Sequence, residues 1–525
     1  MIKSYYVESD GAKLFTVVSL PENAGKVPTV IMRNPYVDDT EKMPEDSVAE
    51  RIAFRHKNFI DNGYAVLYQH CRGRGKSTGD CVPYINERED GLALLEWVRK
   101  QQFYNGEIYL YGASYMASVH FTVAPFAEDI KGAVLDVQDC EKYNCNYRNG
   151  FYKIGHGLWY LGMYKPKKIR VKNFVAESFH TLPLSGFSVS ALGERAEGLE
   201  DIIFHPDKDD AFWNTRYGGG DTHNAVKHAN IPILFTTGFY DIYTGGVFDM
   251  WNGLDEETKN KCALIVHPYD HGCVADGQPV KFENATFNGK FGDYAIKWLN
   301  YIRGKGESPV RTGKVTYYKL FGEEWLTDDF GAPQNQRSFV LGDGEKSYIY
   351  NPYAPAKFKG GLSATGGGNA WQDEPNSRYD IISLFTSEFT EDTFIKGKMR
   401  VKLTVKSDCE DTCFYLRLSL EKKEGYYGLR DDINQISNFD KNYKPNGEIE
   451  MDFSFDEHAF TVKKGERLRI DVSSSAFPSY VRHTNNKGLY SVQTTAKIAK
   501  NTVVLSKSTL TVFCEQNIFK DGETC

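Results

Sequence analysis

The chain has 525 residues, of which 41% are hydrophobic and 25% are charged, and its 63 Lys and Arg residues against 70 Asp and Glu residues give a net charge of −7. A chain of this length predicts two or three domains that can bury a core without disulfide bonds. The mild acidity is spread along the chain and offers no basic face to a nucleic acid and no polybasic patch to an anionic membrane. We therefore expect neither nucleic acid nor membrane as a partner.

The N-terminus and the cysteines favour a cytoplasmic protein. Met1-Ile2-Lys3-Ser4-Tyr5 does not open a secretion signal, and no stretch approaches the ~18 apolar residues of a membrane span. The 10 Cys residues are scattered along the chain, unlike the dense disulfide framework of a small secreted domain. Mostly free, buried thiols are expected.

Short apolar runs alternate with helical patterns between residues 29 and 266, which predicts an α/β fold with a parallel sheet. In the helical segment 87–99, Leu92, Leu94, Leu95 and Val98 fall on one face, as in a crossover helix packed on a sheet. The predicted strands are 29–33, 64–69, 108–111, 132–137, 233–237 and 263–266.

Two segments do not follow this alternation of apolar runs and helical patterns. Residues 138–230 are too long for one crossover, and we expect an inserted helical cap whose aromatic residues, Trp159 among them, form a wall over a ligand cleft. After about Gly313, alternating strands in turn-rich sequence predict a jelly-roll β-sandwich. The predicted domains are a core of residues 1–137 and 231–312, a cap of residues 138–230 and a C-terminal domain of residues 313–525.

The most informative stretch for chemistry is Gly112-Ala113-Ser114-Tyr115-Met116, which follows a predicted strand and precedes a helical run. A serine at such a strand-to-helix turn exposes its hydroxyl at the edge of an α/β sheet, beside backbone N–H groups. The second glycine of Gly-x-Ser-x-Gly is absent, because Met116 occupies its position. Ser114 is the candidate nucleophile.

Two later strands end on residues that could activate this serine. Asp241 follows the strand at 233–237 and His271 follows the strand at 263–266, in the order Ser, acid, His that this fold class uses. His271 would accept the serine proton and Asp241 would orient the imidazole. His267 is a rival base that we expect to be buried structure, and Asp270 is a rival orienter that points away from its neighbour. Tyr36, just beyond the first core strand, is placed where an oxyanion donor belongs.

Several motifs together resemble one family. They are Arg33-Asn34-Pro35-Tyr36, Cys71-Arg72-Gly73-Arg74-Gly75, Gly112-Ala113-Ser114-Tyr115, Gly238-Phe239-Tyr240-Asp241, Asp270-His271-Gly272 and, near the C-terminus, Ser473-Ser474-Ser475-Ala476-Phe477-Pro478. In order and spacing they resemble the cocaine esterase and X-prolyl dipeptidyl-peptidase family of serine hydrolases (CocE/NonD-type hydrolases), over nearly the whole chain.

The resemblance implies an α/β-hydrolase core, a helical cap and a jelly roll, with the cleft where they meet. It implies Ser114, Asp241 and His271 as the catalytic triad, and the Tyr36 hydroxyl with the Tyr115 backbone N–H as the oxyanion hole. Ala117 stands where the family usually has glycine, and its additional methyl group must be accommodated in the packing of the helix. His70-Cys71 replaces a usual acid, which puts in doubt an ion pair with Arg72.

Other site types fit the sequence less well. A nucleotide-binding P-loop would require glycine at position 70, where His70 stands, and a zinc hydrolase would require Glu in the spacing of His267 and His271. We expect no cofactor and no metal. A noncatalytic binding protein with an inactive core is a minority alternative, because all three triad residues are present.

The site predicts hydrolysis of an ester or amide bond in a small molecule or short peptide through an acyl-enzyme. An X-prolyl dipeptidyl-peptidase acting on peptide N-termini is the alternative, and it needs carboxylates for the substrate ammonium. Asp136, Asp139 and Glu141 could serve, or could be solvated loop acids. Phe239 and Tyr240, which precede Asp241, could wall the acyl pocket together with Trp159. A homo-oligomer is neither indicated nor excluded.

Overall fold

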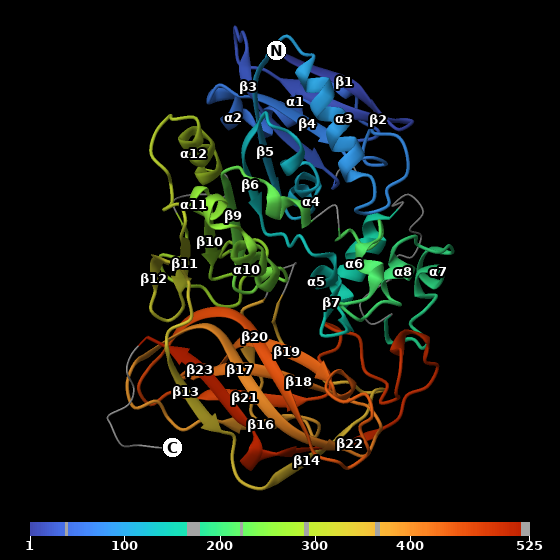
Figure 1. The fold of residues 1–525 in the computed structure, drawn as a ribbon, viewed down its shortest axis with the longest axis vertical. Coiled ribbons are helices and arrows are strands. Elements are labelled where there is room, and N and C mark those ends of the chain that lie inside the picture. Colours follow the sequence, from blue (N-terminus) through green and yellow to red (C-terminus); the bar gives the residue numbers. More distant parts are fainter. Residues whose placement is uncertain (37–39, 165–178, 221–223, 288–292, 363–367, 516–525) are drawn as a thin grey trace.

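The chain folds into three parts that meet at the centre of the molecule (Figure 1). The computed structural model describes residues 1–36, 40–164, 179–220, 224–287, 293–362 and 368–515. Within these ranges, no helix is both long enough and apolar enough to span a membrane.

The core is built on one large sheet. In the described part of the chain its ten strands lie in the order β1-β2-β4-β3-β5-β6-β9-β10-β11-β12. Strands β4 to β11 in this order run parallel, and β1, β2 and β12 are antiparallel additions at the two edges. The strands are β1 (Ile2–Ser9), β2 (Ala12–Ser19), β3 (Val27–Asn34), β4 (Ala65–His70), β5 (Tyr104–Ala113), β6 (Ile130–Asp136), β9 (Ile233–Gly238), β10 (Ala263–His267), β11 (Val315–Lys319) and β12 (Glu324–Asp328).

The sheet is buried on both faces, which explains the continuous apolar runs of its strands. Along β4, Leu67 packs into one core, whereas its neighbours Val66 and Tyr68 pack into the core on the opposite face. The predicted helix over residues 87–99 is α3, which buries Leu94, Leu95 and Val98. The core helices are α1 (Glu45–Arg55), α2 (Lys57–Asp61), α3 (Glu87–Arg99), α4 (Tyr115–Phe121), α10 (Thr244–Gly253), α11 (Glu256–Lys261) and α12 (Asp293–Ile302).

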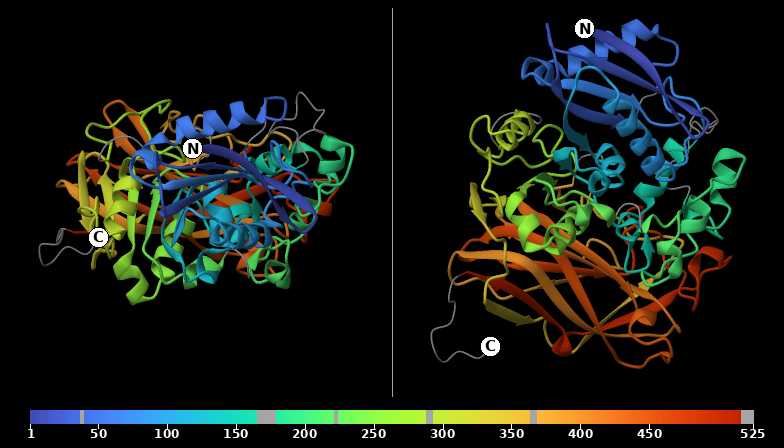
Figure 2. Two further views of the ribbon diagram at one scale, coloured as in Figure 1. Left: turned by 90° about the horizontal axis from the view of Figure 1, so that it is seen from above. Right: turned by 45° about the horizontal axis from the view of Figure 1, so that its top comes forward.

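The cap is inserted between β6 and β9 and lies beside the core, above the C-terminal domain (Figures 1 and 2). Its own aromatic core includes Tyr147, Tyr160 and Trp213. The elements are α5 (Lys142–Asn146), the hairpin β7 (Tyr147–Arg148) and β8 (Phe151–Tyr152), α6 (Ile154–Met163), α7 (Phe187–Leu192) and α8 (Leu199–Ile202).

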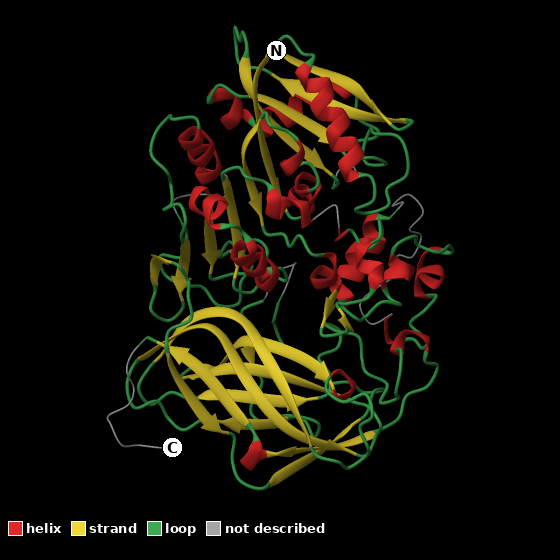
Figure 3. Cartoon of the chain, in the orientation of Figure 1, coloured by secondary structure: helices red, strands yellow, loops and turns green. Residues whose placement is uncertain are grey.

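The C-terminal domain is all β, as Figure 3 shows. One sheet contains β13 (Asn335–Val340), β14 (Glu345–Tyr350), β17 (Thr393–Ser407), β20 (Ile449–Val462), β22 (Ala499–Val504) and β23 (Thr509–Cys514). The other contains β15 (Trp371–Gln372), β16 (Ile382–Phe385), β18 (Cys413–Lys422), β19 (Gly425–Gln435) and β21 (Leu468–Ser473). The predicted fold class, an α/β-hydrolase core with a cap and a C-terminal all-β domain, is confirmed.

The C-terminal domain is attached to both other parts. Arg148 of the cap donates to Asp432 at 2.8 Å and to Asp456 at 2.7 Å, both from the C-terminal domain. On the core side, the Thr461 N–H donates to the Leu320 carbonyl at 2.9 Å.

The predicted boundary at residue 312 requires a correction. Strand β11 pairs in parallel with β10, with Val315 opposite Leu264, and β12 follows it as the edge of the core sheet. The alternating pattern after Gly313 identified strands but could not indicate which sheet they join.

Candidate active site

Ser114 occupies the turn between β5 and α4. Its backbone has φ 58° and ψ −132°, a conformation that costs a non-glycine residue about 1–3 kcal/mol. The turn is also close-packed, because a Cβ on Gly112 would lie 2.3 Å from the Met116 carbonyl oxygen. This geometry holds the Ser114 hydroxyl at the C-terminal edge of the sheet.

Two hydrogen-bond donors converge beside Ser114. The Tyr36 hydroxyl donates to Ser114 Oγ at 3.0 Å, and the backbone N–H of Tyr115 donates to the Tyr36 hydroxyl at 3.0 Å. The Tyr36 ring is 38% exposed because it faces the cavity described below, but its hydroxyl is enclosed, and this burial raises its pKa. The phenol therefore stays neutral and able to donate.

A buried polar network holds the side chain of Tyr115 in place. Its hydroxyl donates to Glu87 at 2.7 Å and accepts from the Tyr84 N–H at 2.6 Å. Glu87 is in turn paired with Arg33 at 3.2 Å. Glu87 carries no signal of this role in the sequence, because its position at the start of an amphipathic helix does not indicate a partner.

His271 and Asp241 form a hydrogen-bonded pair. Nδ1 of His271 lies 2.9 Å from an oxygen of Asp241, which is fully buried and also accepts from the Thr237 hydroxyl and the Tyr243 N–H. Burial alone would lower the pKa of His271, but the charge and hydrogen bond of Asp241, with a contribution from Asp270, raise it above 6.5. Because Nδ1 is engaged by Asp241, Nε2 is the atom left to act on a substrate.

The two rival residues take structural positions. His267 is buried against Trp325, and burial lowers the pKa of its imidazole to about 4. Asp270 accepts from the Gln278 side chain at 2.7 Å and makes no hydrogen bond to His271 among the described residues. Arg72, whose partner was in doubt, pairs with Asp90 at 2.6 Å.

Ser114 and His271 face one cavity of about 950 Å³ at the junction of the three parts. No hydrogen bond joins them in the described structure, where Ser114 Oγ is bonded to Tyr36 instead. The cap contributes Trp159, whose ring meets the Tyr115 ring edge-on with centroids 5.2 Å apart. Other lining residues from the core, cap and C-terminal domain include Met116, Ile242, Tyr243, Lys153, His156, Leu158, Leu362, Asp431, Pro478 and Tyr480.

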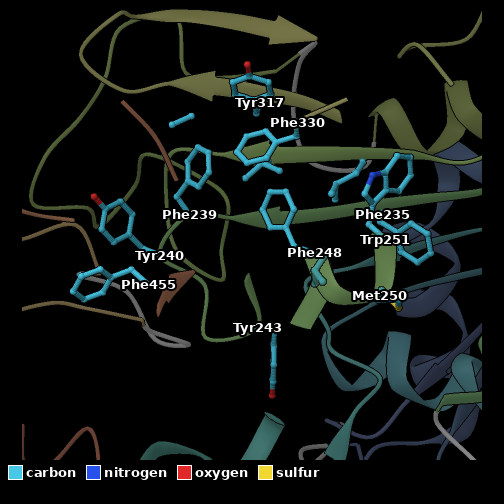
Figure 4. Packing of buried hydrophobic residues seen from close by; sticks show 14 of the residues in the cluster. Phe235, Phe239, Tyr240, Tyr243, Phe248, Met250, Trp251, Tyr317, Phe330 and Phe455 are labelled. Atoms are coloured by element: carbon cyan, nitrogen blue, oxygen red, sulfur yellow. The ribbon is translucent and has the colours of Figure 1, made fainter. Parts of the chain in front are cut away.

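Phe239 and Tyr240 do not line this cavity, which corrects that prediction. Both are fully buried, Phe239 stacked on His458 at 4.7 Å and Tyr240 donating to the Gly428 carbonyl at 2.9 Å. Figure 4 shows them in the hydrophobic cluster with Phe330 and Phe455. They precede Asp241 in sequence, but the C-terminal domain covers the turn on which they lie. Tyr243, two residues after Asp241, faces the cavity instead.

Asp136, at the end of β6, and the cap residues Asp139 and Glu141 are absent from the described lining of the cavity. Burial raises the pKa of Asp136 and Asp139 to about 7, and Glu141 is paired with Lys227 at 3.0 Å. Among the described residues, no three His, Cys, Asp or Glu side chains gather in a way that could hold a metal ion. The nine cysteines among the residues that the structure describes are free and buried.

Comparison with known proteins identifies the family. The model of the X-Pro dipeptidyl-peptidase (S15) family matches residues 10–273, half of the chain, which include every residue of the site described above from Tyr36 to His271. The chain belongs to this family. A second model, of the X-Pro dipeptidyl-peptidase C-terminal non-catalytic domain, matches residues 309–510. The resemblance predicted from the motifs is confirmed, and the protein is a hydrolase of this type.

The known proteins that this chain resembles carry different activities in their names. Cocaine esterase from Rhodococcus sp. (strain MB1 Bresler) is 23% identical over 91% of each chain. Among solved structures, an α-amino acid ester hydrolase (17% identity, TM-score 0.80) and an aminopeptidase from the marine sediment archaeon Thaumarchaeota archaeon (16%, 0.79) each align with 98% of this chain and 96% of their own. These solved structures share the fold of this chain. The type of bond that this protein cleaves has to be inferred from its own site.

Tyr36→Phe should lower kcat by about 10²–10³ if the hydroxyl is an oxyanion donor, with a much smaller effect on KM. Tyr243→Phe removes a phenolic hydroxyl from the same cavity without a bond to Ser114, and should change kcat only a few-fold. Steady-state kinetics on a phenyl ester compares the two. Equal losses in both variants would contradict the assignment of Tyr36.

Activity should fall at acid pH as His271 becomes protonated, with an apparent pKa above 6.5 because Asp241 favours the charged imidazole. Asp241→Asn should move the acid limb of the pH profile of kcat/KM to lower pH and reduce kcat by roughly 10⁴-fold. Asp270→Asn should move the limb in the same direction by less and retain most activity. An unchanged limb in Asp241→Asn would contradict the role of this pair.

Proposed function

We propose that the protein is a serine hydrolase that cleaves esters of small molecules with an apolar or aromatic acyl group. The observation that carries this proposal is that Ser114, the donors Tyr36 and Tyr115, and the His271–Asp241 pair meet at one cavity. These are the nucleophile, the anion-stabilising donors and the oriented base that acyl transfer requires.

The reaction follows from these positions. Ser114 Oγ attacks the ester carbonyl carbon while its proton passes to His271 Nε2, and the carbonyl oxygen takes the negative charge. That oxygen replaces Ser114 Oγ as the acceptor of the Tyr36 hydroxyl and also accepts the Tyr115 N–H. The intermediate collapses to an acyl-serine as His271 gives its proton to the departing alcohol. Water then attacks the acyl-serine by the same steps and releases the acid.

The cavity favours a neutral, apolar acyl group over a peptide N-terminus. Its described lining is dominated by apolar and aromatic side chains, such as Trp159, Ile242 and Leu362. Asp431 is the only carboxylate in that lining, and its Oδ2 accepts from Tyr415 and lies 3.4 Å from Arg417, whereas its Oδ1 accepts no hydrogen bond from any described residue.

The charge beside the cap wall works against an ammonium group as well. Burial, and then the positive charges of Lys142 and Lys153, hold the pKa of His156 well below its usual value. Because His156 and Lys153 both line the cavity, a substrate ammonium beside them would lie near a group of the same charge. The match to the X-Pro dipeptidyl-peptidase family model is the specific observation in favour of the peptidase alternative.

The test compares a phenyl ester with an X-prolyl anilide, using wild type and Ser114→Ala. The wild type should cleave the ester and leave the anilide intact, and Ser114→Ala should lose roughly 10⁴-fold or more in kcat. Ser190→Ala, at an exposed serine of the cap, is the matched control and should keep full activity.

Two outcomes would overturn parts of this proposal. Near-normal turnover by Ser114→Ala would exclude Ser114 as the nucleophile. Cleavage of the anilide by wild type, and not by Ser114→Ala, would retain the serine mechanism and assign the protein to the peptidase branch.

A further inference from the structure

The cavity that contains Ser114 has a polar end, where the cap meets the C-terminal domain. Asp431 of β19 and Tyr480, which follows β21, both line the cavity and are only 5% and 4% exposed. Tyr480 forms an isolated β-bridge with Lys153 of the cap, which lines the cavity as well. We call Asp431, Tyr480 and Lys153 the polar end of the cavity.

Asp431 has one oxygen without a partner. Its Oδ2 accepts from the Tyr415 hydroxyl at 3.0 Å and lies 3.4 Å from Arg417, its cross-strand neighbour on β18. Its Oδ1 is buried and accepts no hydrogen bond from any described residue. An unpaired buried acceptor is unfavourable, and a donor supplied by a ligand would remove this cost. Because Arg417 already offsets the charge of Asp431, the carboxylate needs a donor more than it needs a counter-ion.

Tyr480 provides a second polar atom that is not in use. Its hydroxyl makes no hydrogen bond to any described residue. The backbone before it is fixed to the cap, because the Ile154 N–H donates to the Ser479 carbonyl at 3.3 Å. Burial, and then the negative charge of Asp431, raise the pKa of the Tyr480 phenol well above its usual value, so the phenol stays neutral and able to donate. The effect of Asp431 on this phenol also indicates that the two side chains are near each other.

A hydroxyl group is the ligand group that matches these two side chains. It can donate to Asp431 Oδ1 and accept from the Tyr480 hydroxyl at the same time, whereas a carbonyl or ether oxygen can only accept and an ammonium can only donate. Lys153 disfavours an ammonium further, because its Nζ, which donates to the Asn144 carbonyl at 2.6 Å, carries the same charge.

We propose that the polar end selects substrates that carry a hydroxyl group away from the ester, bound between Asp431 and Tyr480. This inference rests on the proposed function and adds to it a feature of the substrate. The aromatic acyl group would pack on apolar lining residues such as Trp159 and Leu362, and its hydroxyl would reach the polar end. Asp431 and Tyr480 would then determine specificity through substrate binding, with no part in the acyl transfer itself.

Matched phenyl esters test this proposal. The phenyl esters of para-hydroxybenzoate, para-hydroxyphenylacetate and para-hydroxyphenylpropanoate place the hydroxyl progressively farther from the reacting carbonyl, and each is compared with the plain ester that lacks the hydroxyl. In at least one pair, kcat/KM should be about tenfold higher for the hydroxyl ester, because a hydrogen bond to a carboxylate is gained. The difference should lie in KM, since this bond forms equally in the ground state and the transition state.

Two variants should remove this preference. Tyr480→Phe deletes only the hydroxyl. Asp431→Asn should keep its oxygen towards Tyr415 and Arg417, which puts an amide donor in place of Oδ1. Each variant should lower kcat/KM about tenfold for the hydroxyl ester and much less for the plain ester, and far-UV circular dichroism should show that both are folded. Tyr379→Phe, at an exposed tyrosine of the C-terminal domain, is the matched control and should keep the preference.

Calorimetric titration of the intact esters into Ser114→Ala repeats the comparison without turnover. A hydroxyl preference in binding, combined with no ester cleavage by wild type, would contradict the proposed function and support the role of the polar end. Equal affinity within every pair, or a preference that survives in Asp431→Asn and Tyr480→Phe, would overturn the present proposal. Tighter binding of a para-aminomethyl ester than of the hydroxyl ester would also overturn it, because Asp431 would then act as a counter-ion.

Discussion

The site depends on the strained backbone of Ser114. A positive φ at the end of β5 turns the chain into α4 so abruptly that the serine hydroxyl and the next N–H lie within reach of the Tyr36 hydroxyl. A conformation of this cost persists only where the surroundings hold it. Here the close packing of Gly112 and the bonds from Tyr115 to Glu87 and Tyr84 hold both ends of the turn. The proposed nucleophile and its proposed anion-stabilising donors are thus positioned before a substrate arrives.

The three parts of the molecule make different contributions to the site. The core sheet brings together the proposed reacting groups, because Tyr36, Ser114, Asp241 and His271 all follow the C-terminal ends of parallel strands. The cap and the C-terminal domain supply the walls of the cavity, and the Arg148 ion pairs hold them against each other. Because side chains from all three parts line one cavity, selectivity for the acyl group can change without any change in the reacting groups.

The sequence predicted what depends on local pattern. The bounds of α3 and the approximate positions of six core strands along the chain follow from apolar periodicity, and the strand-end positions of Ser114, Asp241 and His271 follow from motif order. Long-range packing was not accessible in this way. Phe239 and Tyr240 adjoin Asp241, yet the C-terminal domain buries them, and the cavity is walled by residues as distant as Asp431 and Tyr480. The edge strands β1 and β2 were missed, and β11 and β12 were assigned to the wrong sheet.

The assignment of Ser114 as the residue that forms the covalent intermediate can be tested by trapping that intermediate. The wild type and Ser114→Ala would be treated with a fluorophosphonate, whose phosphorus a serine attacks in place of a carbonyl carbon, and the adduct would be located by peptide mass spectrometry. This assignment predicts one adduct, on the peptide that contains Ser114, and none on this peptide in Ser114→Ala. An active enzyme that is labelled at a different residue, or that retains turnover after Ser114 is fully labelled, would contradict it.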